Sequence, residues 1–127
     1  MADASRAEKG ISIIQWLFGK GATPTRMPEA FARITVENLF GDVWSRPGLE
    51  ITERSLITLS ALIVLGRENE LRIHLRGARN LGIAREKIEE VMIHLAHYGG
   101  WPVAVSGFRA LDEVWAAMDA EQKTPSP

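Results

Sequence analysis

The sequence contains no cysteine among its 127 residues. Disulfides, thiolate nucleophiles, cysteine-ligated metals and dithiol redox chemistry are therefore excluded. An excess of positive charge is also missing, because 15 basic residues face 16 acidic ones and the net charge is −1. Binding to nucleic acid is not expected, since proteins that bind it usually carry a basic excess.

Long hydrophobic runs and targeting signals are missing as well. The longest apolar run, ALIVL at 61–65, is far too short to cross a bilayer. The polar start MADASRAEKG has no cationic segment leading into an apolar one, so no signal peptide is visible. We therefore expect a cytoplasmic protein without membrane association. The GxSxG, Walker and GxGxxG motifs are absent too.

No segment shows the alternation of a β-strand, and no internal repeat stands out. The apolar spacing predicts an all-α protein, a single domain over 1–127 with flexible tails at about 1–4 and 121–127. Ser5, with Glu8 three residues later, is expected to cap the first helix. About six helices are expected, near 5–18, 28–44, 52–65, 67–80, 85–99 and 101–120. Gly19 and Gly21 are expected to end the first helix, Pro28 to lie in the first turn of the second, and Gly82 to close the fourth.

Apolar spacing also predicts the core faces of the last two helices. For 85–99 these residues are Ile88, Val91, Met92, Leu95 and Gly99, and for 101–120 they are Ala104, Gly107, Phe108, Leu111, Trp115 and Met118.

The stretch from 52 to 82 carries the strongest functional signal. Its first half is apolar on almost every side, a pattern typical of a helix surrounded by protein. After a break at Gly66 the pattern turns polar, and Arg67, Glu70 and His74 recur at i, i+3 and i+7. A cation, an acid and an imidazole in one stripe suit acid–base chemistry. An exposed helix face with an i,i+3 ion pair gives the same spacing.

Positive charge is concentrated near this stripe. Four arginines but only two glutamates lie between 67 and 82, and this local excess favours an anionic ligand. Arg46, in the turn SRPG at 45–48, is either a solvated loop charge or an anion contact.

The helix predicted at 85–99 carries two histidines three residues apart. His94 and Tyr98 flank its core face and are placed to line a pocket. His97 points nearly opposite that face, which favours a subunit contact or exposure to solvent. No further ligands at zinc spacing accompany the pair, so no metal site is predicted.

Several motifs between about residues 36 and 115 together resemble the carboxymuconolactone decarboxylase family. They are the turn W-x-R-P-G-L, the helix segment RSLIT, the segment RExELxxHLRxA, the helix opening G-I-x-R-E-K-I and a late G-x-P-x-A, and they follow one another in that order. The likeness is nearest to the short, single-domain γ-carboxymuconolactone decarboxylases of aromatic-acid catabolism.

This resemblance implies an all-helical homo-oligomer, a trimer or a hexamer, that needs no cofactor. The implied reaction is the loss of CO2 from a small conjugated lactone acid. His74 is then expected to deliver a proton and Glu70 to orient or tune it, while Arg67, with Arg46, holds a carboxylate. Further expected substrate contacts are Trp44, Tyr98 and Ile14.

A related branch, the alkylhydroperoxidase-D-like proteins, carries CxxCxxxH. Aligned on His74, its two cysteines fall at Arg67 and Glu70, so its peroxide-linked disulfide chemistry is excluded here. Ser55 stands where that branch has a glutamate in its central helix, so no proton relay through that glutamate is expected.

The N-terminal helix departs from the decarboxylases. Ile14 and Gln15 stand where those proteins carry a pair of arginines before the closing glycine. Two alternatives therefore stay open. One is a diverged decarboxylase, isomerase or cyclase for a larger, more apolar, polyketide-like substrate. The other is a non-catalytic oligomeric binding protein.

Overall fold

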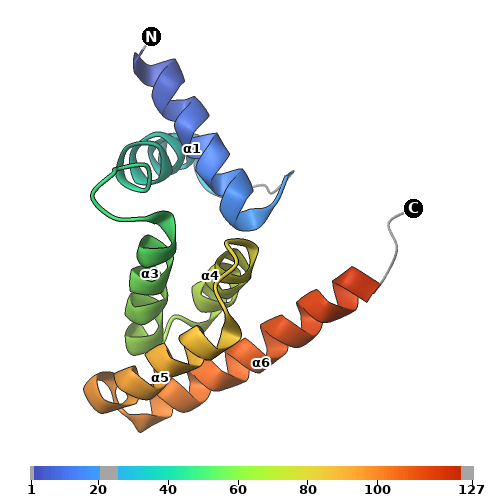
Figure 1. Ribbon diagram of the computed structural model, residues 1–127. Coiled ribbons are helices and arrows are strands. Elements are labelled where there is room, and N and C mark those ends of the chain that lie inside the picture. Colours follow the sequence, from blue (N-terminus) through green and yellow to red (C-terminus); the bar gives the residue numbers. More distant parts are fainter. Residues whose placement is uncertain (1, 21–25, 124–127) are drawn as a thin grey trace. The chain divides into compact units, whose positions relative to one another are not determined.

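The computed structural model describes residues 2–20 and 26–123, and these residues form helices and no strands, as predicted (Figure 1). Counting the π-helix η1 as the continuation of α2, the described chain has the six expected helices. Their bounds are Ala2–Phe18 for α1, Glu29–Ile34 for α2, Thr35–Val43 for η1, Ile51–Leu65 for α3, Glu68–Asn80 for α4, Arg85–Gly99 for α5 and Trp101–Lys123 for α6. None of the described helices is long and apolar enough to span a membrane.

The chain divides into two compact units, residues 1–54 and 55–127. The first unit contains α1, α2 and η1, and the second contains α4, α5, α6 and most of α3. The single domain expected from the sequence stays a prediction. Helices α1 and α6 extend into both expected tails, since they include residues 2–4 and 121–123.

The first helix begins earlier than the sequence suggested. Because α1 starts at Ala2, Ser5 and Glu8 lie inside the helix, and the predicted capping box is wrong. Alanine is the best helix former, and Ala2 and Ala4 continue the helix beyond the predicted cap. At the other end, Gly19 follows α1 with a φ of 93°, whereas Gly21, the second expected stop, lies outside the described residues.

Close contact between backbones holds the first unit together. A Cβ atom added to Gly10 would overlap the carbonyl oxygen of Val36, and one added to Gly41 would overlap that of Arg6. The guanidinium of Arg6 also donates to the carboxylate of Asp42 at 2.9 Å. The two glycines therefore let α1 lie directly against η1.

The π-helical bonding of η1 was not predicted. The amide of Trp44 donates to the carbonyl of Leu39, five residues earlier, at 2.9 Å. An α-helix was expected over this whole segment, with Pro28 in its first turn. Pro28 is instead the N-cap of α2. Apolar spacing does not distinguish α-helical from π-helical bonding in so short a segment, because both bury one apolar face of the helix.

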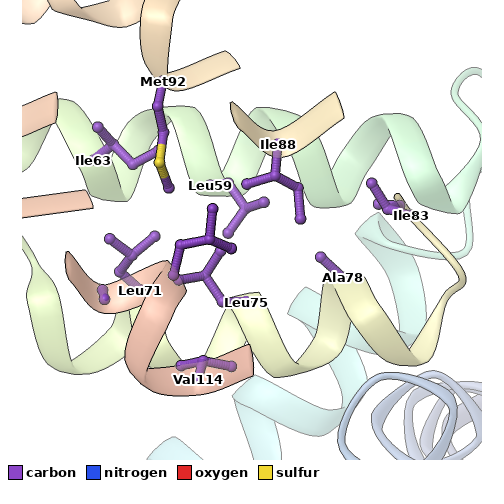
Figure 2. Packing of buried hydrophobic residues seen from close by; sticks show 11 residues of the cluster. Leu59, Ile63, Leu71, Leu75, Ala78, Ile83, Ile88, Met92 and Val114 are labelled. Carbon is purple, nitrogen blue, oxygen red and sulfur yellow. The ribbon is translucent and has the colours of Figure 1, made fainter. Parts of the chain in front are cut away.

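A hydrophobic core fills the second unit between its four helices (Figure 2). Its members are Leu59 and Ile63 from α3, Leu71, Leu75 and Ala78 from α4, Ile83, Ile88 and Met92 from α5 and the segment before it, and Ala110, Leu111 and Val114 from α6. The helical spacing predicted Ile88, Met92 and Leu111 on core faces, whereas Ala110, Val114 and the connecting residue Ile83 were not expected there. Gly66, with a φ of 70°, ends α3, and Gly82, with a φ of 85°, ends α4, both as predicted.

The central helix α3 is buried on one side only. Leu59 and Ile63 are buried, but Ile57 is 55% exposed and Leu65 is 70% exposed. The expectation that protein surrounds this helix is therefore not met within one chain.

Candidate functional site

The predicted stripe of Arg67, Glu70 and His74 lies at the start of α4. Arg67 is the N-cap, with φ −88° and ψ 75°, and its carbonyl accepts the amide of Leu71 at 2.9 Å. Glu70 follows in the first turn. Both exposed side chains line one hollow of about 260 Å³, formed by residues 66–70. His74, one turn further along, is not part of its lining.

His74 is half-buried, unlike its two companions. Burial lowers the pKa of His74 below 6.5, because a charged imidazolium is poorly solvated there. At pH 7 the free protein therefore holds this ring mainly in its neutral form. Desolvation is the cause of this shift, and the orienting or tuning of His74 by its i,i+4 neighbour Glu70 stays a prediction.

The three arginines within α4 form ion pairs with carboxylates of α6. Arg72 donates to Glu113 at 2.9 Å, Arg76 to Glu121 at 2.6 Å and Arg79 to Asp119 at 2.6 Å. The local positive excess that favoured an anionic ligand is therefore balanced by carboxylates from another helix, and that inference was wrong for these three residues. Among the described residues, no carboxylate pairs with Arg67.

His94 and Tyr98 lie on the exposed surface of α5. Their rings stack with centroids 5.0 Å apart and an interplanar angle of 24°. Both line a hollow of about 390 Å³ together with Glu90, Ile93 and His97. His97 is exposed in the single chain, as both of its predicted alternatives require, and its Nδ1 lies 2.9 Å from the carbonyl oxygen of Ile93.

The remaining predicted contacts belong to the first unit. Ile14 and Trp44 are buried, at 9% and 7% exposure, and the Trp44 ring lies 5.8 Å from that of Phe40. Arg46 is exposed, and its carbonyl accepts a hydrogen bond from Arg54 Nη2 at 3.1 Å. The turn around Arg46 is thus tied to the start of α3.

Three polar residues were not singled out as contacts by the sequence. Ser60 and Lys87 line a hollow of about 400 Å³ together with His94. Ser55 is fully buried, and its hydroxyl has no hydrogen-bond partner among the described residues. The only sign of this burial in the sequence was that Ser55 lies four residues before Leu59, on the same side of the helix. No group of three or more His, Cys, Asp or Glu side chains in the described ranges is arranged to hold a metal ion.

The fold and the site together define a class of protein. It is an all-α protein with a polar site at the N-terminal end of one helix, formed by the arginine, glutamate and histidine of RExELxxH. The model of the carboxymuconolactone decarboxylase family matches residues 29–113, and the chain belongs to this family. The resemblance inferred from the motifs is therefore confirmed.

Three curated relatives match the chain over most of this region. A 4-carboxymuconolactone decarboxylase of Acinetobacter baylyi is 42% identical over 76 residues, covering 60% of this chain and 57% of the relative. The nitrosuccinic acid decarboxylase npaB of Metarhizium robertsii is 38% identical over 86 residues, 68% of this chain and 59% of the relative. An uncharacterized 15.0 kDa protein of Paracoccus denitrificans is 31% identical over 88 residues, 68% of this chain and 66% of the relative. The chain thus spans less than two thirds of the length of each.

Proposed function

We propose that the chain is a carboxy-lyase that removes CO2 from a small conjugated acid of the 4-carboxymuconolactone type. Arg67 carries the proposal. It is the one arginine of the stretch 67–79 that has no carboxylate partner among the described residues, and it stands on the same helix as the half-buried His74. Two relatives named as decarboxylases support the reaction class.

The chemistry requires an anion contact and a proton. The bond to the departing carboxylate breaks heterolytically, CO2 leaves, and the electron pair moves into the conjugated system as a dienolate, which is then protonated on carbon. Arg67 would hold a carboxylate with two parallel hydrogen bonds. His74 would donate the proton, with Glu70, its i,i+4 neighbour, positioned to stabilise the imidazolium.

The lowered pKa of His74 adds a condition to this mechanism. The donor must be the imidazolium, which is a minor form in the free protein at pH 7. A bound dianion would raise the pKa of His74 by charge attraction, so the ring would gain its proton when the substrate binds. The imidazolium that acts as the acid would therefore form mainly in the complex with the substrate.

A turnover assay tests the proposal. γ-Carboxymuconolactone is generated in the reaction mixture, and the loss of its absorbance and the release of CO2 are followed. Arg67→Ala and His74→Ala should each reduce kcat/KM by at least 100-fold. Arg67→Lys should recover only part of the loss, because an ammonium cannot bind bidentately. Arg76→Gln, which removes an arginine of the same helix from an ion pair, is the matched control and should retain activity. Full turnover by both alanine variants would disprove the assignment.

The pH dependence of turnover provides a second test. If free His74 must gain a proton, kcat/KM should fall as pH rises above the lowered pKa of His74, that is, from below pH 6.5. The fall in kcat should lie at higher pH, since the bound anion raises the same pKa. A kcat/KM that instead rises through this range would mean that His74 acts in its neutral form.

We further propose that the protein works as a homo-oligomer, without a cofactor, in the cytoplasm. Both units expose large apolar side chains that one chain leaves uncovered, among them Trp16, Phe31 and Leu65 at 56%, 57% and 70%. Decarboxylation into a conjugated acceptor needs no metal or Schiff base in principle, because the substrate itself accepts the electron pair.

The alternative of a larger apolar substrate rested on Ile14 and Gln15. Ile14 is buried, so the structure provides no specific observation in favour of that alternative. The M. robertsii relative is named for a different acid, and nitrosuccinic acid is therefore the second substrate to assay.

A further inference from the structure

A hollow lies between α3 and α5, apart from the one at the head of α4. Its volume is about 400 Å³, and sites for small molecules usually measure about 300–1,000 Å³. Its lining consists of Ser60 from α3 and of Lys87, Glu90, Val91, His94 and Leu95 from α5. This α3–α5 hollow shares no residue with the one formed by residues 66–70, and it has room for a ligand of its own.

The polar groups of the α3–α5 hollow form a stripe along α5. Lys87, Glu90 and His94 recur at i, i+3 and i+7, so they lie on one side of the helix. Arg85 and Glu89, on the opposite side of α5, form an ion pair with each other at 3.2 Å. Lys87 and Glu90 form no ion pair within the described ranges. Two charges of opposite sign are therefore available to a ligand in the hollow.

The rest of the lining supplies an apolar base and a further hydrogen-bond acceptor. Val91 and Leu95 are half-buried and pack against the core of the second unit. The hydroxyl of Ser60 donates to the carbonyl of Leu56 at 2.8 Å, so the hydroxyl oxygen is left to accept a hydrogen bond from a ligand. A ligand that lies on this base therefore needs an apolar part and a hydrogen-bond donor.

The His94 ring adds a flat side to the hollow. It stacks on Tyr98 with ring centroids 5.0 Å apart and an interplanar angle of 24°, and this contact restricts its rotation. A ring held in one orientation favours a ligand that is itself flat, because planar groups pack against it by offset stacking or edge contact.

We propose that the α3–α5 hollow binds a hydroxylated aromatic carboxylate, at a place separate from the catalytic site. Lys87 would bind the carboxylate by a charge-assisted hydrogen bond. A simple anion would be repelled by Glu90, whereas a ligand hydroxyl can donate to Glu90 or to the oxygen of Ser60. The aromatic ring would lie over the apolar base beside His94. Each group of the ligand thus has a matching group in the lining.

The chain has only three histidines, and this makes a direct test available. Proton NMR of the intact protein follows their ring signals during titration with 4-hydroxybenzoate, and His94→Gln identifies the signal of His94 by its loss. The acid should shift the His94 signal saturably and leave that of His74 in place. A shift of the His74 signal alone would assign the acid to the catalytic site and overturn the proposal, as would the absence of any shift.

Variants of the hollow complete the test. Lys87→Met should raise the dissociation constant for 4-hydroxybenzoate about fivefold or more, because the charged partner of the carboxylate is lost. Lys123→Met, an exposed lysine at the end of α6, is the matched control and should leave the constant unchanged. The same Lys87→Met change should not weaken binding of 4-hydroxybenzyl alcohol, which has no carboxylate. Equal affinity of Lys87→Met and the wild type for 4-hydroxybenzoate would contradict the proposal.

The test is independent of the proposed decarboxylation. Binding is measured without turnover, and Arg67→Ala, which removes the proposed anion contact of the catalytic site, should bind 4-hydroxybenzoate in the α3–α5 hollow with the dissociation constant of the wild type. A shift of the His94 signal that disappears in Arg67→Ala would mean that the two places are not separate.

Discussion

Residues of one type have different roles along a single helix. Arg79 is held by Asp119, by the carbonyl oxygen of Trp115 at 3.2 Å and over the Trp115 ring at 5.2 Å. Arg67 has no such carboxylate partner among the described residues, because it stands at the N-cap, outside the helical segment whose arginines face the carboxylates of α6. Arg67 is thus available to bind a substrate carboxylate because of its position at the N-cap, and not because of its residue type.

His74 should make the stability of the protein depend on pH. Its pKa is lowered in the folded state, so the unfolded chain binds more protons just below pH 6.5. The free energy of unfolding should therefore fall as pH drops below 6.5. His74→Gln should lose this part of the decline in urea titrations compared at pH 7.5 and pH 5. The exposed His97→Gln is the control, and an equal change in both variants would contradict the assignment to His74.

At the scale of elements, two kinds of helix contact organise the chain. The contact between α1 and η1 depends on glycines that allow backbones to touch, and the contact between α4 and α6 adds arginine–carboxylate pairs to an apolar core. The first kind tolerates no added atom, whereas exposed ion pairs contribute little individually.

Gly10→Ala should destabilise the first unit by about 1–3 kcal/mol or more, because the new Cβ overlaps the carbonyl oxygen of Val36. Gly48→Ala is the matched control, since nothing lies within 4 Å of its added Cβ. Chemical denaturation followed by circular dichroism measures both. If the two variants unfolded at the same denaturant concentration, α1 and η1 would not be in backbone contact.

Arg79→Ala should cost about 1–2 kcal/mol, because it removes two hydrogen bonds and a cation–π contact. Arg72→Ala removes one exposed pair with Glu113 and should cost only about 0.2–1 kcal/mol. Urea denaturation at low and at high salt distinguishes the two, since salt should reduce the second cost more. The reverse order would mean that the Trp115 contacts contribute nothing.

At the scale of the whole molecule, apolar surface remains exposed on both units. If oligomerisation covers it, the melting temperature should rise with protein concentration, because association stabilises the folded chain by mass action. Differential scanning calorimetry over a hundredfold concentration range measures this. A melting temperature independent of concentration would argue for a monomer.

The sequence by itself determined the helical class, the helix-ending glycines at 66 and 82, the core positions Ile88, Met92 and Leu111, and the family. Each of these follows from local spacing, local backbone chemistry or the order of short motifs. The positions of Arg67, Glu70 and His74 along one helix were also readable, since i, i+3 and i+7 spacing needs no tertiary information.

Only the tertiary structure decided which of these groups are available and in which protonation state. The partners of Arg72, Arg76 and Arg79 lie about 40 residues away in sequence, on α6, and no local pattern reveals them. The burial that lowers the pKa of His74 likewise arises from packing between helices. Charge and desolvation depend on neighbours in space, so the candidate site was visible in the sequence as positions, while its electrostatics depended on the fold.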